Sequence, residues 1–159
     1  LFGEDGGFDF MKGLHSNINQ YTKSGSAPIK AAGRGETTIG IVFMHDAVKQ
    51  AVKGFPVKVV APAEGTGYEI GSMSIIDGAR NMKEAKAFYD WALSADAQNL
   101  ALEVNAFQVP SNTGAKTSAS APDMSTIKLI DYDFKTYGSS ATRKRLLKKW
   151  DDEVSVLAQ

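Results

Sequence analysis

The 159-residue sequence contains no cysteine. This absence excludes disulfide bonds, zinc–thiolate and iron–sulfur sites and a cysteine nucleophile, and it leaves the redox compartment open. Eighteen Lys and Arg residues balance eighteen Asp and Glu residues, so no excess of one sign attracts nucleic acid or an anionic membrane. No apolar run approaches the ~18 residues of a membrane-spanning helix. The composition is that of one ordinary folded domain.

Several site types lack the residues that they require. His15 and His45 are the only histidines, which excludes a metal site built from histidines alone. No Gly-x-Ser-x-Gly elbow, phosphate-binding loop or dinucleotide-binding glycine pattern occurs. A phenolate pair for ferric iron has no obvious place either, because no two tyrosines are adjacent: they are Tyr21, Tyr68, Tyr89, Tyr132 and Tyr137. The sequence therefore gives little support for an enzyme.

Apolar residues at steps of three and four predict helices at both ends of the chain. The first carries Phe8, Met11, Leu14, Ile18 and Tyr21 on one face. The last is expected to begin at a Ser140 cap and to bury Leu146, Leu147, Trp150, Val154 and Leu157.

Between them we predict helices over residues 28–33, 47–54 and 96–104. A further helix over residues 81–94 carries a capping-box spacing between Asn81 and Glu84.

Runs of β-branched and apolar residues predict strands over residues 37–43, 57–61, 70–76 and 127–132. The first run, TTIGIVF, is apolar on both faces, which is typical of a strand buried in an α/β sheet. A Ser, Thr, Ala and Pro-rich stretch over residues 113–122 is expected to be a long loop.

His45 and Asp46 follow the predicted strand 37–43. In open α/β sheets ligands bind beyond the carboxyl ends of strands, and an imidazole beside a carboxylate binds sugar hydroxyls, a metal ion or a shared proton. The structural alternative is that Asp46 caps a helix beginning at Ala47 while His45 fills a strand end. The residues alone leave both interpretations open.

Two further segments concentrate polar groups. Residues 64–69 (EGTGYE) combine two carboxylates, a hydroxyl and a phenol, from Glu64, Thr66, Tyr68 and Glu69, with Gly65 and Gly67; a plain glycine-rich turn is the alternative. Ser24, Gly25 and Ser26 precede Pro28, where hydroxyls and N–H groups at a helix start suit a phosphate or carboxylate. An ordinary serine N-cap is the alternative there.

Four linked segments, in this order, resemble the C-terminal half of periplasmic solute-binding proteins of the ferric-ion type, which serve ABC importers. They are residues 32–46 (AGRGETTIGIVFMHD), 59–74 (VVAPAEGTGYEIGSMS), 78–81 (GARN) and 107–112 (FQVPSN). The resemblance covers about residues 10–154. Because the chain begins at Leu1, without an initiator methionine, we expect a fragment or a processed form.

The resemblance implies an α/β, type II periplasmic-binding-protein fold with three-layer αβα lobes and a mixed sheet, closing on ligand by a hinge. This chain would be a C-terminal fragment that lacks the start of the first lobe. Residues 1–75 would form the second-lobe core, 76–126 would cross to the first lobe, and 127–159 would return to the second lobe with the C-terminal helix.

The resemblance also implies the function. True ferric binders of this type carry two consecutive tyrosines where this chain has His45 and Asp46, so a phosphorylated sugar or other organophosphate fits better than iron. Carried over from the family, His45, Asp46 and Glu69, with Thr66, Gly67 and Tyr68, would contact polyol hydroxyls, and Ser24, Gly25 and Ser26 would form part of an anion site.

We therefore expect a periplasmic, non-enzymatic ABC-importer subunit, without cofactor, monomeric when full length, whose partners are a small anionic ligand and a membrane permease. Two alternatives stay open. One is ferric iron bound through His45 and Asp46 with a synergistic anion. The other is a hydrolase or isomerase fragment that uses His45 with Asp46 as general base.

Overall fold

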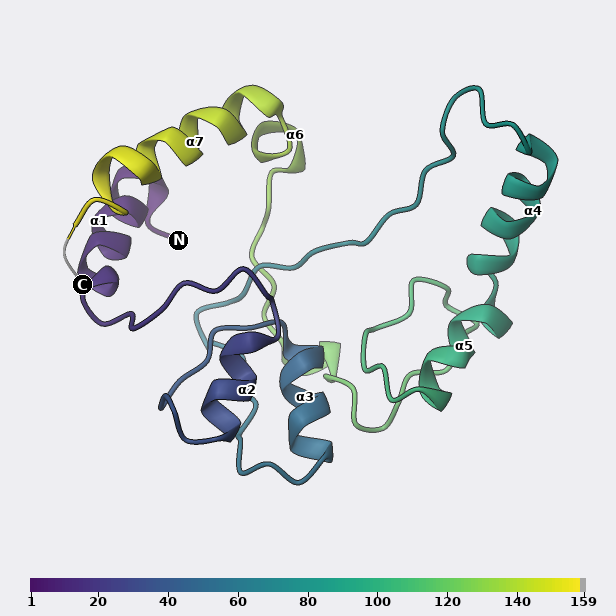
Figure 1. Cartoon of the computed structure of the whole chain (residues 1–159), viewed down its shortest axis with the longest axis horizontal. Helices are drawn as coiled ribbons and strands as arrows, with labels where there is room; N and C mark the ends of the chain where they lie inside the picture. Colours follow the sequence, from purple (N-terminus) through teal and green to yellow (C-terminus); the bar gives the residue numbers. More distant parts are fainter. Residues whose placement is uncertain (158–159) are drawn as a thin grey trace. The chain divides into compact units, whose positions relative to one another are not determined.

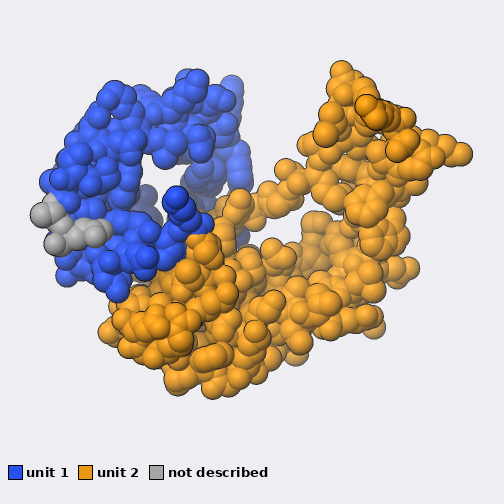
Figure 2. Space-filling view, viewed as in Figure 1, with its two compact units in different colours: residues 1–23, 129–159 blue, residues 24–128 orange. Residues whose placement is uncertain are grey.

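The computed structural model describes residues 1–157. Its contacts divide the chain into two compact units (Figure 2). Unit 1 consists of Leu1–Lys23 and Leu129–Gln159, and unit 2 consists of Ser24–Lys128. Each unit is described by itself below. The predicted division at residues 75 and 126 stays a prediction.

Unit 1 is helical, with α1 (Gly3–His15) and the short α6 (Phe134–Tyr137) both contacting α7 (Ser140–Glu153) (Figure 1). Acidic residues lie in the first turn of α1 and basic residues in its last turn, which complements the helix dipole. Val154, just after α7, is completely buried, and Phe8 and His15 of α1 are buried as well. The apolar contact between α1 and the end of α7 therefore forms a small core.

Ion pairs join α1 to α7 around this core. A bidentate pair places Arg145 Nη2 2.8 Å from Glu4 Oε2, and the Lys149 ammonium lies 4.6 Å from the centroid of the Phe8 ring. The pairs are Glu4 with Arg145, Asp5 with Lys149 at 2.7 Å, Glu4 with Lys149 at 3.5 Å, and Lys12 with Glu153 at 2.8 Å. The charged rims of the two helices thus complement each other.

Unit 2 contains two helix pairs. α2 (Ala27–Gly33) packs against α3 (Met44–Val52), and α4 (Met82–Ala92) packs against α5 (Ala95–Glu103), with a 3-10 turn, η1, at Met124–Thr126. A Cβ on Gly40 would lie 2.7 Å from the Pro28 carbonyl oxygen, so only glycine allows this close approach of residue 40 to the start of α2.

The side chain of Asn112 organises the chain after α5. Its Nδ2 donates to the Leu93 carbonyl at 2.8 Å, and its Oδ1 accepts from the Gly114 amide at 2.9 Å. The Asn112 amide itself donates to Gln98 Oε1 at 2.9 Å. One side chain therefore connects the α4–α5 junction to the following loop.

Most helix predictions are confirmed, with corrections at their ends. α1 ends at His15, before Ile18 and Tyr21, because Ser16 Oγ and Asn17 Nδ2 both donate to the Gly13 carbonyl and compete with further helical turns. Ser139, not Ser140, caps α7 by accepting from the Thr142 amide at 3.2 Å.

Two local expectations for helices were wrong. Asn81 precedes α4 without a side-chain capping bond, so the capping box does not form. The predicted buried stripe of α7 holds at Val154, whereas Leu147 and Leu157 are exposed. No helix within residues 1–157 combines the length and apolarity that crossing a membrane requires.

The four predicted strands do not form within residues 1–157, so the expected mixed sheet is not seen there. Residues 37–43, predicted to be buried on both faces, expose Ile39 to 76 %, and Ile76 in the run 70–76 is 80 % exposed. A strand satisfies its N–H and C=O groups only through a neighbouring strand, and these runs have none here. Near the start of the predicted strand 127–132, the Thr66 amide donates to the Lys128 carbonyl at 2.9 Å.

Candidate functional site

His45 and Asp46 lie in the first turn of α3, not at the end of a strand as predicted. The helix begins one residue after Phe43, which is extended at φ −62° and ψ 135°, and no side chain caps it. The alternative that Asp46 serves as a helix cap is therefore wrong. An acidic residue in the first turn still gains from the helix dipole.

The two side chains form a loose pair that solvent reaches. His45 Nε2 lies 3.9 Å from Asp46 Oδ2, and the side chains are 30 % and 24 % exposed. The separation is longer than a hydrogen bond, so neither side chain uses the hydrogen-bonding capacity of the other. The pair can offer an imidazole and a carboxylate to a third, hydroxyl-bearing molecule.

The aromatic ring of Phe43 brings a second predicted segment to this pair. The ring stacks on the His45 imidazole with centroids 5.6 Å apart and planes inclined by 15°. The ring also lies near Gly25, where an added Cβ would be 3.8 Å from two ring carbons. Phe43 thus stacks on His45 and lies close to Gly25 of the serine segment 24–26.

The serine segment 24–26 leads directly into α2. Ser26 occupies the N-cap position without a side-chain capping bond, and the Ala27 amide donates to the Ser24 carbonyl at 3.2 Å. The alternative of an ordinary serine cap is therefore not realised. Because α2 has only seven residues, we assign no anion site to its helix dipole; the segment offers the hydroxyls of Ser24 and Ser26 and the backbone N–H groups.

The loop over residues 64–69 turns on Gly65, which is buried at φ +121° and donates its amide to the Pro62 carbonyl at 3.1 Å. Glycine is required at such a φ, so part of the loop is the plain turn given as the alternative. Gly67, Tyr68 and Glu69 are exposed after it. Among the described residues, no hydrogen bond or ion pair joins Thr66 or Glu69 to His45 or Asp46.

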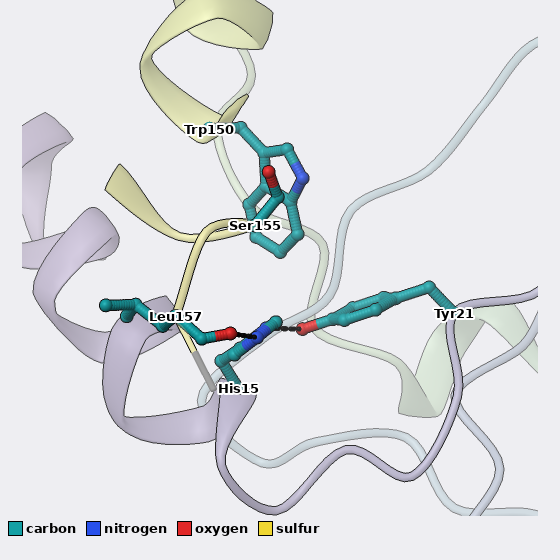
Figure 3. Close-up of a pocket in the computed structure, with 5 residues that line it drawn as sticks. All are labelled: His15, Tyr21, Trp150, Ser155 and Leu157. Carbon is teal, nitrogen blue, oxygen red and sulfur yellow. Dashed lines mark hydrogen bonds between the residues drawn. The ribbon is translucent and has the colours of Figure 1, made fainter. Parts of the chain in front are cut away.

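A separate cavity lies within unit 1 (Figure 3), with a volume of about 700 Å³ and a lining of His15, Tyr21, Trp150, Ser155 and Leu157. His15 is only 3 % exposed. Its Nε2 lies 3.0 Å from the Leu157 carbonyl oxygen, which can only accept, so Nε2 carries the hydrogen. In the neutral imidazole Nδ1 then accepts from the Tyr21 hydroxyl at 3.0 Å.

Both nitrogens of His15 are therefore occupied by the protein itself. The Tyr21 ring stacks on the imidazole, and Trp150 meets Tyr21 edge to face with centroids 5.4 Å apart. His15 is thus a core histidine of unit 1. The cavity contains none of the predicted ligand residues.

No group of three or more His, Asp or Glu side chains in the described part of the chain is arranged to hold a metal ion. For iron, His45 and Asp46 would supply only two ligands.

Comparison with known proteins places the chain among solute-binding proteins. Residues 1–136 match the sequence model of a family described as bacterial extracellular solute-binding protein. An uncharacterized protein of Haemophilus influenzae is 48 % identical over 157 residues, which cover 98 % of this chain and 45 % of that protein.

Two solved structures are also similar. The periplasmic binding protein AfuA from Actinobacillus pleuropneumoniae, with exogenous fructose-6-phosphate bound, is 51 % identical, with a TM-score of 0.91 over 98 % of this chain and 49 % of that one. The periplasmic binding protein P5PA is 41 % identical, with a TM-score of 0.88 over 96 % of this chain and 49 % of that one. The chain thus spans about half the length of the proteins it matches and shares the fold of that half.

Proposed function

The chain belongs to the family of bacterial extracellular solute-binding proteins, and from this premise we propose that it is part of a periplasmic ABC-importer subunit that binds a phosphorylated small polyol, such as a hexose phosphate. Its mechanism would be binding and delivery to a membrane permease, without bond chemistry. The relative AfuA was solved with fructose-6-phosphate, which supports this ligand class.

The observation that supports the proposal is the position of one ring, Phe43, which stacks on His45 and lies close to Gly25 of the serine segment. A phosphorylated polyol has an anionic end that requires hydrogen-bond donors and a hydroxyl end that is served by acceptors. Ser24, Gly25 and Ser26 offer hydroxyl and backbone N–H donors for the phosphate. His45 and Asp46 offer an imidazole and a carboxylate for the hydroxyls.

The loop over residues 64–69 is the third proposed element. We propose that the Glu69 carboxylate accepts from a further hydroxyl and that Thr66, Gly67 and Tyr68 shape the same wall of the site. These residues are solvent-accessible in the isolated chain, as an open ligand surface requires.

The exposed apolar runs 37–43 and 70–76 are consistent with the same fold. We propose that they join a mixed sheet when paired with strands from the half of such proteins that this chain does not match. Burial of residues such as Ile39 would then follow, at roughly 25 cal/mol for each Å² removed from water.

The test is a binding screen on the protein as its gene encodes it, with hexose phosphates, phosphonates, inorganic phosphate and ferric citrate. A ligand that binds only the folded state raises the melting temperature in proportion to the logarithm of its concentration over Kd. We expect stabilisation by hexose phosphates. Stabilisation by ferric citrate alone, or turnover of the sugar phosphate, would contradict the proposal.

The site assignment is tested by the double variant His45→Ala with Asp46→Ala. It should abolish hexose-phosphate binding in calorimetry and leave the far-UV circular dichroism unchanged. The matched control is Arg34→Ala with Glu36→Ala, because this exposed ion pair, with 2.6 Å between Nε and Oε1, also lies in unit 2. Unchanged affinity in the His45/Asp46 double variant would refute the assignment.

A further inference from the structure

Two phenylalanines lie close to two glycines at the two ends of α2. Before the helix, the Phe43 ring lies close to Gly25, where a Cβ would lie 3.8 Å from two ring carbons. At the end of the helix, Phe55 approaches Gly33, where a Cβ would lie 3.3–3.4 Å from the Phe55 side chain. Both phenylalanines are about half-exposed. They differ in one respect, because Phe43 also stacks on an imidazole.

The backbone of Phe43 is fixed independently of its ring. Its carbonyl accepts from the Asp46 amide at 3.0 Å and from the Ala47 amide at 3.3 Å, which starts α3. The ring therefore projects from a hydrogen-bonded turn. The ring then stacks on the imidazole of His45 and lies close to Gly25.

Resting on the function proposed above, we infer that Phe43 is a positioning residue that fixes the orientation of His45 and its spacing from the serine segment 24–26. Stacked aromatic rings prefer a defined offset geometry, so the Phe43 ring restricts the rotamers of His45. A ligand that must reach both the serines and His45 depends on that spacing. Inorganic phosphate is too small to contact both the serines and His45, so its binding does not depend on that spacing.

Phe43 thus determines specificity for a phosphorylated polyol over free phosphate without itself forming polar contacts. Pre-organised binding groups raise affinity because less conformational entropy is lost on binding. Loss of the Phe43 ring should therefore weaken the binding of the phosphorylated polyol and leave the binding of inorganic phosphate unchanged.

The experiment compares Phe43→Leu with the matched control Phe55→Leu in the protein as its gene encodes it, with calorimetry of glucose 6-phosphate and of inorganic phosphate. We expect Phe43→Leu to weaken glucose 6-phosphate binding about tenfold, near the upper end of what an aromatic pair contributes, and to leave phosphate affinity within about twofold. Phe55→Leu should leave the ratio of the two affinities unchanged. Phe43→Tyr, which keeps the aromatic ring, should show the same ratio of the two affinities as the wild-type protein.

A ligand-free readout tests the positioning itself. The chain has two histidines, so the ring resonances of His45 are assigned by their loss in His45→Ala. Phe43→Leu should shift these resonances by removing the stacked ring, and Phe55→Leu should not. Unmoved His45 resonances, or an unchanged affinity ratio in Phe43→Leu, would overturn the inference while leaving the proposed function intact. Failure of the wild-type protein to bind any hexose phosphate would overturn the proposed function and with it the specificity role.

Discussion

The hydroxyl of Tyr21 lies 3.0 Å from Nδ1 of His15, whose Nε2 in turn donates to the carbonyl of Leu157. A residue beyond the end of α1 and a residue beyond the end of α7 are thus bound to the two sides of one buried imidazole. The imidazole therefore connects the end of α1 to the segment that follows α7.

Tyr21→Phe should destabilise unit 1 by about 1 kcal/mol, because it leaves the buried Nδ1 without its donor. His15→Ala should cost about 2 kcal/mol or more, because it also removes the ring from its packing. The measurement is urea denaturation followed by Trp150 fluorescence in a Trp91→Phe background. Equal stability of Tyr21→Phe and the parent would show that the hydroxyl contributes nothing.

The pairing of α1 with α7 should weaken in acid. The Arg145 guanidinium, by its hydrogen bonds, lowers the pKa of Glu4 below its ordinary 4.5. A lowered folded-state pKa means that this contribution is complete above pH 4.5 and is lost as the pH falls through the lower folded value. The melting temperature of unit 1, followed by Trp150, should therefore fall on acidification. Glu4→Gln should flatten that dependence.

The same interface should weaken at high pH for the opposite reason. The Asp5 carboxylate raises the pKa of Lys149 above its ordinary 10.5, and Glu153 does the same for Lys12. Such contributions are complete below pH 10.5 and are lost as the pH rises through the raised values. Added salt screens exposed pairs, so 1 M NaCl should reduce both the acid and the alkaline dependence. A slope in pH that salt does not change would argue against the ion pairs as its source.

Gly40→Ala should disrupt the α2–α3 pair of unit 2. The new Cβ would meet the Pro28 carbonyl at a distance that real Cβ atoms do not adopt, and such overpacking typically costs about 1–3 kcal/mol. Gly71→Ala is the matched control, because nothing lies within 4 Å of its Cβ position. Chemical denaturation of both variants gives the comparison, with the loss expected for Gly40→Ala only.

Asn112→Ala should loosen the loop after α5 locally. It removes the donor to Leu93 and the acceptor of the Gly114 amide, at about 1 kcal/mol for each hydrogen bond. Hydrogen exchange should show the Gly114 amide losing protection. The Lys116 amide, which donates to Asn99 Oδ1 at 2.7 Å, should keep its protection and so serve as an internal control.

Local sequence patterns predicted the helices, which depend on interactions between residues close in the sequence. The helix predicted over residues 81–94 is confirmed as α4 (Met82–Ala92), because a helix satisfies its own backbone within one segment. The β-branched run 37–43 predicted a strand that does not form in these residues, since strand pairing depends on a partner elsewhere. The resemblance of the four linked segments correctly indicated the solute-binding family.

The sequence could suggest which residue types form the candidate site, but it could not predict how these residues are arranged in space. His45, Asp46 and the serines were proposed from their chemistry and stay a prediction, but the placement of His45 and Asp46 at the end of a strand was wrong. The proximity that links them is that of Phe43 to Gly25, a tertiary relationship between residues 18 positions apart that no periodicity encodes. The role of His15 likewise depends on a distant residue, because its partner Leu157 is 142 positions away.

Unit 1 is assembled from the first 23 residues of the chain and its last 31, with all of unit 2 between them. During translation, α1 therefore leaves the ribosome long before α7 exists. Glu4 is made 141 residues before its partner Arg145. Because domains generally fold as they are synthesised, unit 1 can form only after α7 has been made, and α1 has no partner helix until then.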